Sequence, residues 1–291
     1  MSKIYVIVGP TACGKTKVSI ELAKYLKAEI INADAVQVYK DVNIGTAKIT
    51  QSEMEGIKHH LIDYVSLDKR YTIYNYQKDG RNILNKLTNE NKNIVIVGGS
   101  GLYIKSLLYD YNLEPEIKNN NNYEELTNEE LKELVNNIDP NNDIHINNRK
   151  RLLRYLEHYN NTGKIIKNNE LKDKPLYDFK IIYLKPNRKE LYNIINNRVD
   201  EMIKNGLIEE AKYLFNKNIN TNSIIGYKEL NEYFKGNISL EEAIELIKKN
   251  TRHYAKRQLT WINNQFKDKI EIDVNYNNFN ESIKKVLNSV K

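Results

Sequence analysis

Eight consecutive residues near the start of the chain could bind phosphate, because they match the pattern G-x-x-x-x-G-K-[ST] without a mismatch. In that pattern, backbone N–H groups surround a diphosphate at a helix N-terminus, a lysine supplies a point charge, and a hydroxyl can ligate Mg²⁺. A glycine turn followed by a surface lysine is the alternative. We predict a site for a diphosphate or polyphosphate, with Mg²⁺ as cofactor and Thr16 as its ligand, made by Gly9, Pro10, Thr11, Ala12, Cys13, Gly14, Lys15 and Thr16.

A carboxylate is placed where it could face this loop. Asp34 lies at the carboxyl end of the predicted strand 29–32, and in a doubly wound sheet this edge faces the ligand crevice. A carboxylate there can accept a proton from an acceptor substrate held against the bound phosphates. We therefore predict Asp34 as a general base; an aspartate that only caps the following turn is the alternative.

Other features narrow the reaction. The chain has no NKxD motif, which disfavours a GTPase, and its third apolar run ends in Gly98-Gly99-Ser100-Gly101 rather than a Walker-B aspartate, which disfavours a motor-type ATPase. His59 and His60 are adjacent and lack convincing partners, so a metal site there is not favoured.

Arg198 has an unusual position on its predicted helix. It lies four residues after Ile194 and four before Met202, on the apolar stripe. A charged group there is costly unless it is paired. A salt bridge to a core carboxylate or a stem that reaches solvent would satisfy it, as would a bound anion.

The elements that must position these groups alternate between strands and helices. Apolar runs at 4–8, 29–32, 93–97 and 179–184 are uninterrupted, which is typical of a buried parallel sheet. Helices are expected directly after 14, over 102–108 and from 187 to 206. The fold class is therefore α/β: a P-loop core with a mostly parallel sheet flanked by helices.

An inserted all-helical subdomain is expected within this core. Between 114 and 175 the strand signals vanish, and a capping box at Thr127-Asn128-Glu129-Glu130 predicts a helix start. We predict a catalytic core of 1–114 and 176–291 and a helical insertion of 115–175. After Gly206 the chain is expected to be helical, with a long last helix from Ser239 to about Trp261.

Composition limits the partners and the compartment. Lys and Arg number 45 against 38 Asp and Glu, a net charge of +7 that favours a phosphate-rich partner. The single cysteine, Cys13, excludes an intrachain disulfide. No apolar run approaches the ~18 residues that cross a bilayer, so we expect a cytoplasmic protein without membrane contact.

Seven segments in the same order resemble the bacterial tRNA dimethylallyltransferases, and together they cover almost the whole chain. They are residues 9–16, 34–39 (Asp-Ala-Val-Gln-Val-Tyr), 44–48, 59–63, 98–103, 226–229 and 249–261. The resemblance implies transfer of a dimethylallyl group from dimethylallyl diphosphate to N6 of the adenosine directly 3′ to a tRNA anticodon. It implies Asp34 as the base, Ser100 near the acceptor, and Thr16, Lys15 and Arg198 at the donor diphosphate.

The resemblance also implies a set of tRNA contacts, in a monomer that binds the anticodon stem-loop. The residues are Asp34, Ala35, Val36, Gln37, Ser100, Lys150, Arg151, Leu152, Leu153, Arg154, Gly226, Tyr227, Lys256, Arg257, Gln258 and Trp261. Cations interleaved with aromatic rings on the last helix agree with this, because unpaired bases stack on such surfaces. For the basic helix at 149–154, a solvated helix face is the alternative.

Two competing hypotheses remain from the sequence. A P-loop kinase for a small molecule or nucleotide would use Asp34 on a hydroxyl and 149–154 as a phosphate lid. A catalytically inert RNA-binding P-loop protein would bind tRNA and leave it unmodified.

Overall fold

The structure is a computed structural model that describes residues 2–113, 115, 123, 125–165 and 173–291. Contacts within the chain divide it into two units, one of Met1–Tyr109 with Pro175–Lys291 and one of Asp110–Lys174. The second unit thus begins before residue 115, where the sequence placed the boundary. The site described below lies in the first unit.

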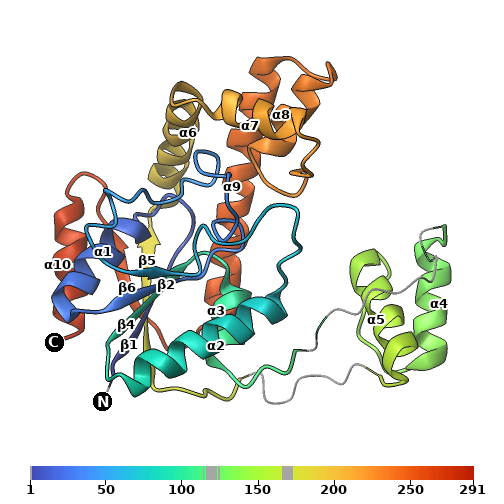
Figure 1. Ribbon diagram of the computed structural model, residues 1–291, viewed down its shortest axis with the longest axis horizontal. Helices are drawn as coiled ribbons and strands as arrows, with labels where there is room; N and C mark the ends of the chain where they lie inside the picture. Colours follow the sequence, from blue (N-terminus) through green and yellow to red (C-terminus); the bar gives the residue numbers. More distant parts are fainter. Residues whose placement is uncertain (1, 114, 116–122, 124, 166–172) are drawn as a thin grey trace. The chain divides into compact units, whose positions relative to one another are not determined.

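A parallel sheet forms the centre of the first unit (Figure 1). Among the described residues it has six strands in the order β3-β2-β4-β1-β5-β6, and every pairing is parallel. The strands are β1 (Ile4–Val8), β2 (Glu29–Asn32), β3 (His59–His60), β4 (Ile94–Gly98), β5 (Phe179–Pro186) and β6 (Ile270–Val274). The predicted mostly parallel sheet is confirmed, and β1 and β4 are buried along their whole length.

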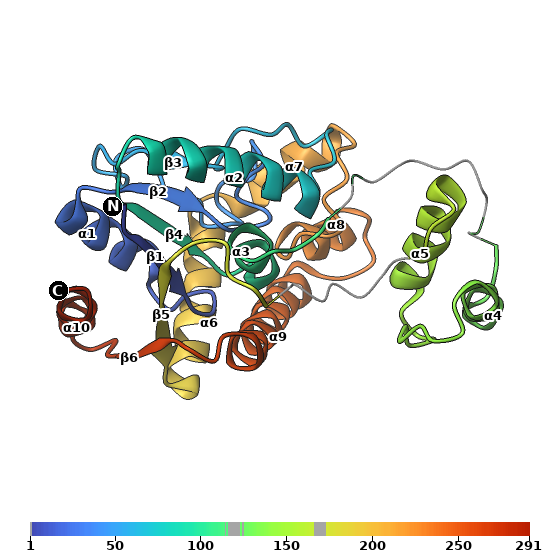
Figure 2. The same cartoon turned by 90° about the horizontal axis from the view of Figure 1, so that it is seen from below.

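Helices cover both faces of this sheet (Figure 2). One face packs α2 (Ile73–Asn89), α3 (Gly101–Leu108) and the end of α9 (Leu240–Gln265), and the other packs α1 (Lys15–Leu26) and α10 (Phe279–Ser289). A further apolar core joins α6 (Arg188–Lys204), α7 (Leu207–Asn216) and α8 (Tyr227–Phe234) to the first turns of α9. No described helix is long and apolar enough to cross a membrane.

Local sequence signals explain several helix boundaries. The predicted capping box at Ser239 begins α9, and Gly206, at φ 100°, separates α6 from α7. The predicted long helix is α9, which ends at Gln265, one turn beyond Trp261. The expectation that the region after Gly206 is helical and ends in this long helix is wrong on two points, because α9 is followed by a strand, β6, and by a further helix, α10.

The second unit contains α4 (Asn128–Ile138) and α5 (Arg149–Thr162). The predicted capping box at Thr127 is present, with Glu130 as the reciprocal partner. The two helices pack through an apolar core. Arg149 donates to the carbonyl oxygens of Leu126 and Tyr123, so its guanidinium ties α5 to the segment before α4.

Candidate functional site

The predicted phosphate loop connects β1 to α1. Gly14 has φ 87°, and a Cβ there would lie 2.1 Å from the ring of Phe279, so only glycine fits. The hydroxyl of Tyr276, in the segment before α10, donates to the carbonyl of Ala12 at 3.3 Å and adds a second contact to the loop. The Cys13 thiol is fully buried, and burial raises its pKa, so the residue serves as packing.

Lys15 folds back onto its own loop. Its Nζ donates to the carbonyl oxygens of Gly9 at 3.0 Å and Pro10 at 2.7 Å. Burial lowers the pKa of Lys15, while Cys13 and Asp34 act in the opposite direction. Thr16 is exposed and lines the same cavity as Lys15. An anion in this cavity would meet the lysine and the N–H groups at the start of α1.

Asp34 follows β2 and caps the turn after it, while one of its oxygens remains available. Its Oδ1 accepts from the N–H groups of Val36 at 2.9 Å and Gln37 at 3.2 Å, so it caps the next turn. None of the described residues donates to Oδ2. One oxygen therefore fixes the carboxylate, and the other can accept a proton.

Arg198, on α6, lines the same cavity as Lys15 and Asp34. Burial lowers the pKa of its guanidinium, and nearby Asp34 opposes this shift. In the part of the chain that the structure describes, Arg198 forms no hydrogen bond or ion pair. The core salt bridge considered from the sequence is thus absent among those residues, and the guanidinium is placed to receive an anion.

Two cavities meet at Asp34 and Arg198. The phosphate-loop cavity, of about 950 Å³, contains Lys15 and Thr16, whereas the α8–α9 cavity, of about 460 Å³, extends to Gly226, Asn250 and Arg257. Residues shared by both linings are Thr11, Ala12, Asp34, Thr46, Ala47, Arg198, Met202 and Tyr254. A phosphorylated donor in one cavity and an acceptor in the other would therefore meet beside the carboxylate.

Two predicted contact residues bridge loops inside the site. Gln258 accepts from the N–H of Thr11 at 2.8 Å and donates to the carbonyl of Gly99 at 3.0 Å. It is 6% exposed, so the expected tRNA contact through this side chain is not what the structure shows. The Ser100 hydroxyl accepts from the N–H of Ala35 at 3.0 Å and thus holds the backbone next to Asp34.

The other predicted tRNA residues divide by exposure. Lys150, Arg151, Arg154, Lys256 and Arg257 are exposed, and Ala35, Val36, Gln37, Leu153 and Trp261 are partly buried. Leu152 and Tyr227 are 0% exposed, so direct contact through these side chains is wrong. The reason is packing, because Leu152 fills the core between α4 and α5 and Tyr227 lies against Gly45. Gly226 is also buried, and its φ of 98° favours glycine.

A basic hollow of about 500 Å³ lies along the second half of α9. Lys256, Arg257 and Trp261 line it, together with His253 and Thr260. The Trp261 ring is packed on Gly101, where a Cβ would come within 2.1 Å. Cations beside an indole ring form a surface suited to an unpaired base and its phosphate.

The described residues offer few side chains that could ligate a metal ion. Within the described ranges, no group of three or more His, Cys, Asp or Glu side chains could hold an ion. His60 instead contacts Glu29 at 2.6 Å. The Thr16 hydroxyl fits Mg²⁺, since this ion takes one or two protein ligands and completes its shell with substrate phosphates and water.

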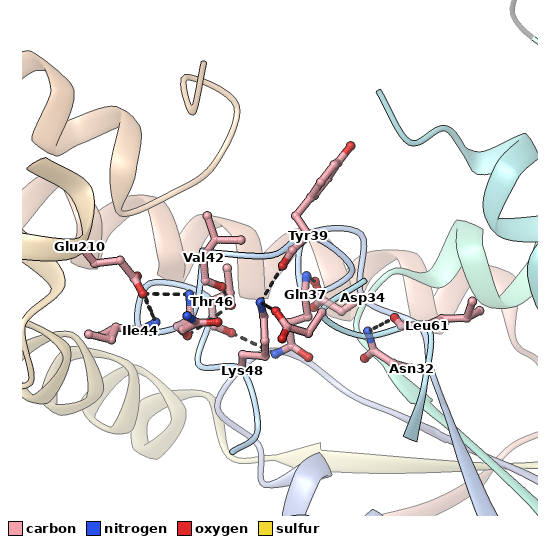
Figure 3. A network of polar contacts seen from close by, with 12 residues as sticks. Asn32, Asp34, Gln37, Tyr39, Val42, Ile44, Thr46, Lys48, Leu61 and Glu210 are labelled. Carbon is pink, nitrogen blue, oxygen red and sulfur yellow. Dashed lines mark hydrogen bonds and ion pairs between the residues drawn. The ribbon is translucent and has the colours of Figure 1, made fainter. Parts of the chain in front are cut away.

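Glu210 and Lys48, which no sequence pattern singled out, support the loop between β2 and β3 (Figure 3). Lys48, with its side chain 5% exposed, donates to the carbonyl of Tyr39 and to Asp63, each at 2.6 Å. Glu210 accepts from the backbone of 43–45. Glu210 lies between Leu207 and Leu214 on the apolar stripe of α7. A charged residue on an apolar stripe is the pattern that drew attention to Arg198, and it could have identified Glu210 as well.

A parallel sheet, a strand–loop–helix unit that matches the phosphate-loop pattern, an opposing arginine and a carboxylate between two cavities form the arrangement expected of an enzyme that acts on a phosphorylated substrate. Sequence comparison identifies the family: the profile described as IPP transferase matches residues 37–265. The chain belongs to the IPP transferase family, which contains the tRNA dimethylallyltransferases, a class of prenyltransferases.

Curated relatives match almost the whole chain. A tRNA dimethylallyltransferase of Enterococcus faecalis is 46% identical over 277 residues, which cover 91% of this chain and 90% of the relative. A second, from Acholeplasma laidlawii, is 44% identical over 270 residues and covers 93% and 92%. The resemblance seen in the sequence motifs therefore reflects homology over almost the whole chain.

Solved structures match the fold. A tRNA isopentenylpyrophosphate transferase from Staphylococcus epidermidis is 38% identical, with a TM-score of 0.74 over 100% of this chain and 99% of the other. A eukaryotic dimethylallyltransferase acting on tRNA is 27% identical, with a TM-score of 0.79 over 94% of this chain and 74% of the other. The mostly parallel sheet flanked by helices that the sequence predicts is confirmed by these matches.

Proposed function

We propose that this chain transfers the dimethylallyl group of dimethylallyl diphosphate to N6 of the adenosine directly 3′ to the anticodon of tRNA, with release of diphosphate. The observation that carries the proposal is the position of Asp34, at the boundary of a phosphate-loop cavity and a second cavity. The relatives that bear the name tRNA dimethylallyltransferase support the choice of substrates. We place the reaction in the cytoplasm, by a monomer that binds the anticodon stem-loop.

The donor diphosphate would occupy the cavity of Lys15, Thr16 and Arg198. As the bond from the allylic carbon to the diphosphate oxygen breaks, negative charge grows on the leaving group, and the N–H groups of the loop, Lys15 and Arg198 stabilise it. Mg²⁺, held by the Thr16 hydroxyl and phosphate oxygens, would supply additional positive charge there.

The acceptor needs a base, because the lone pair of the adenine N6 amine is conjugated with the ring. As the new N6–carbon bond forms, the amine loses a proton, and Oδ2 of Asp34 accepts it. An adenine stacked in the anticodon loop must leave its neighbours to reach this oxygen. The basic hollow with Lys256 and Trp261 is suited to hold the displaced RNA.

The decisive experiment is incubation of the protein with dimethylallyl diphosphate, Mg²⁺ and unmodified tRNA, followed by nucleoside mass analysis. We expect adenosine to gain the mass of one dimethylallyl group. Unchanged RNA, with donor and tRNA shown to be active in a parallel reaction with an established relative, would refute the proposal. An arm with ATP and no prenyl donor tests the kinase hypothesis, which requires ATP consumption.

Replacing Lys256 by alanine is expected to weaken tRNA binding and to reduce the slope of log affinity against log salt by about 1. The reason is that this lysine is exposed on the basic hollow, where we propose that it contacts one RNA phosphate. Lys284→Ala is the control, because this lysine is also exposed but lies on α10, away from the hollow (Figure 2). Equal salt slopes for Lys256→Ala and the unaltered protein would show that Lys256 does not contact an RNA phosphate.

A further inference from the structure

One carboxylate holds the backbone of an active-site loop. Glu210 on α7 accepts from three consecutive N–H groups, those of Asn43 at 3.0 Å, Ile44 at 3.0 Å and Gly45 at 3.2 Å (Figure 3). We call residues 43–47 the clamped loop. Three charge-assisted hydrogen bonds to one side chain fix the loop relative to α7 much more firmly than neutral contacts would.

Tyr227 contacts both Glu210 and the clamped loop. Its hydroxyl donates to Oε1 of Glu210 at 2.5 Å. The ring lies so close to Gly45 that a Cβ at that glycine would come within 2.5 Å of it. Burial and the neighbouring Glu210 raise the pKa of Tyr227, which keeps its hydroxyl protonated as a donor. The clamped loop, α7 and α8 are thus joined through the Glu210–Tyr227 pair.

The clamped loop is connected to the proposed base through Gln37. The Gln37 side chain donates to the carbonyl oxygens of Thr46 at 3.0 Å and Ala47 at 3.3 Å, while its backbone N–H donates to Oδ1 of Asp34. Thr46 and Ala47 also line both cavities, beside Arg198. A displacement of the clamped loop would therefore be transmitted to the carboxylate and to the walls on either side of it.

We propose that Glu210, supported by Tyr227, is a positioning residue that sets the orientation of Asp34 against the acceptor through the clamped loop and Gln37. This inference rests on the proposed function, since it concerns the geometry of that transfer. Neither residue touches the reacting atoms. Their contribution is to the rate of the chemical step, because a displacement of about 1 Å at a reacting group can cost about 100-fold in rate.

The test uses Glu210→Gln, because the amide has a similar shape but only one acceptor oxygen and places an N–H donor against backbone N–H groups. At saturating donor and tRNA we expect the single-turnover rate to fall by about 10- to 100-fold. Affinities for tRNA and for inorganic diphosphate should stay within about threefold, and the melting temperature should identify a variant that fails to fold. Tyr227→Phe, which keeps the ring, should give a smaller loss of the same kind.

Hydrogen exchange gives a readout that does not depend on activity. The amides of 43–45 should exchange faster in Glu210→Gln and remain slow in Glu209→Gln, an exposed neighbour on α7 that makes the same charge change. A normal single-turnover rate in Glu210→Gln, or a rate loss matched by an equal loss of substrate affinity or of folded protein, would overturn the inference alone. Absence of product with the unaltered protein would instead overturn the proposed function.

Discussion

Replacement of Asp34 by asparagine is expected to lower the rate of dimethylallyl transfer by about 10²- to 10⁴-fold, the usual contribution of a general base. The structure makes this variant unusually clean. The two hydrogen bonds that hold the turn are accepted by Oδ1, and an asparagine side chain retains an acceptor oxygen in that place. What is lost is the second oxygen, which the amide nitrogen replaces and which can no longer accept the N6 proton.

The measurement for Asp34→Asn is the single-turnover rate together with tRNA affinity. We expect the affinity to remain within a few fold of the unaltered protein. Asp41→Asn is the matched control, because Asp41 is exposed in the same connection, has φ 63°, and loses the same charge in a backbone conformation that asparagine tolerates. A rate for Asp34→Asn equal to that of the unaltered protein would show that another group accepts the proton.

The second large effect is expected for Arg198→Gln. We predict a loss of about 10²- to 10³-fold in kcat, because a preorganised donor to the departing diphosphate is removed. The arginine has no ion pair among the described residues, so its removal leaves no protein carboxylate without a partner. Affinity for inorganic diphosphate, measured by calorimetry, should fall as well.

Two further variants make the result for Arg198 specific. Arg198→Lys keeps the charge but not the bidentate geometry, so it should recover only part of the rate. Arg188→Gln is the control, since Arg188 is exposed on the first turn of the same helix and bonds only to Tyr192 in the described structure. If Arg198→Gln bound diphosphate as tightly as the unaltered protein, the guanidinium would not contact the diphosphate of the prenyl donor.

The elements of the sheet core that could be predicted are those with a continuous apolar signal. Strands β1 and β4 are apolar at every position because helices cover both faces. Strand β6 reads Ile-Glu-Ile-Asp-Val at the sheet edge, where alternate residues meet solvent, so it lacked that signal. The strand β3 has only two residues, too few for any periodicity.

In the site, the residues that could be predicted are those marked by neighbouring residues in the sequence, whereas contacts between distant residues could not be predicted. The phosphate loop is contiguous in the sequence, and Asp34 is marked by the end of an apolar run. The bond from Glu210 to the backbone of Gly45 crosses 165 residues. The apolar stripe on α7 indicates that the Glu210 carboxylate faces inward, but it does not indicate which residues that carboxylate contacts. Tyr227 was expected to contact tRNA because a motif gives the position of a residue but not the direction of its side chain. In the structure its ring packs against Gly45, which has no side chain to prevent this contact.

The contact of Tyr276 and Phe279 with the phosphate loop has a consequence for the order of events during synthesis. The loop is translated early, yet Ala12 and Gly14 are supported by residues translated more than 260 positions later. Strand β1, which carries the loop, also pairs only with strands made after it. A nascent chain therefore exposes an unfinished loop on the ribosome, and long-range pairings of this kind fold slowly. The loop therefore reaches its final packing only after the C-terminal residues that contact it have been made.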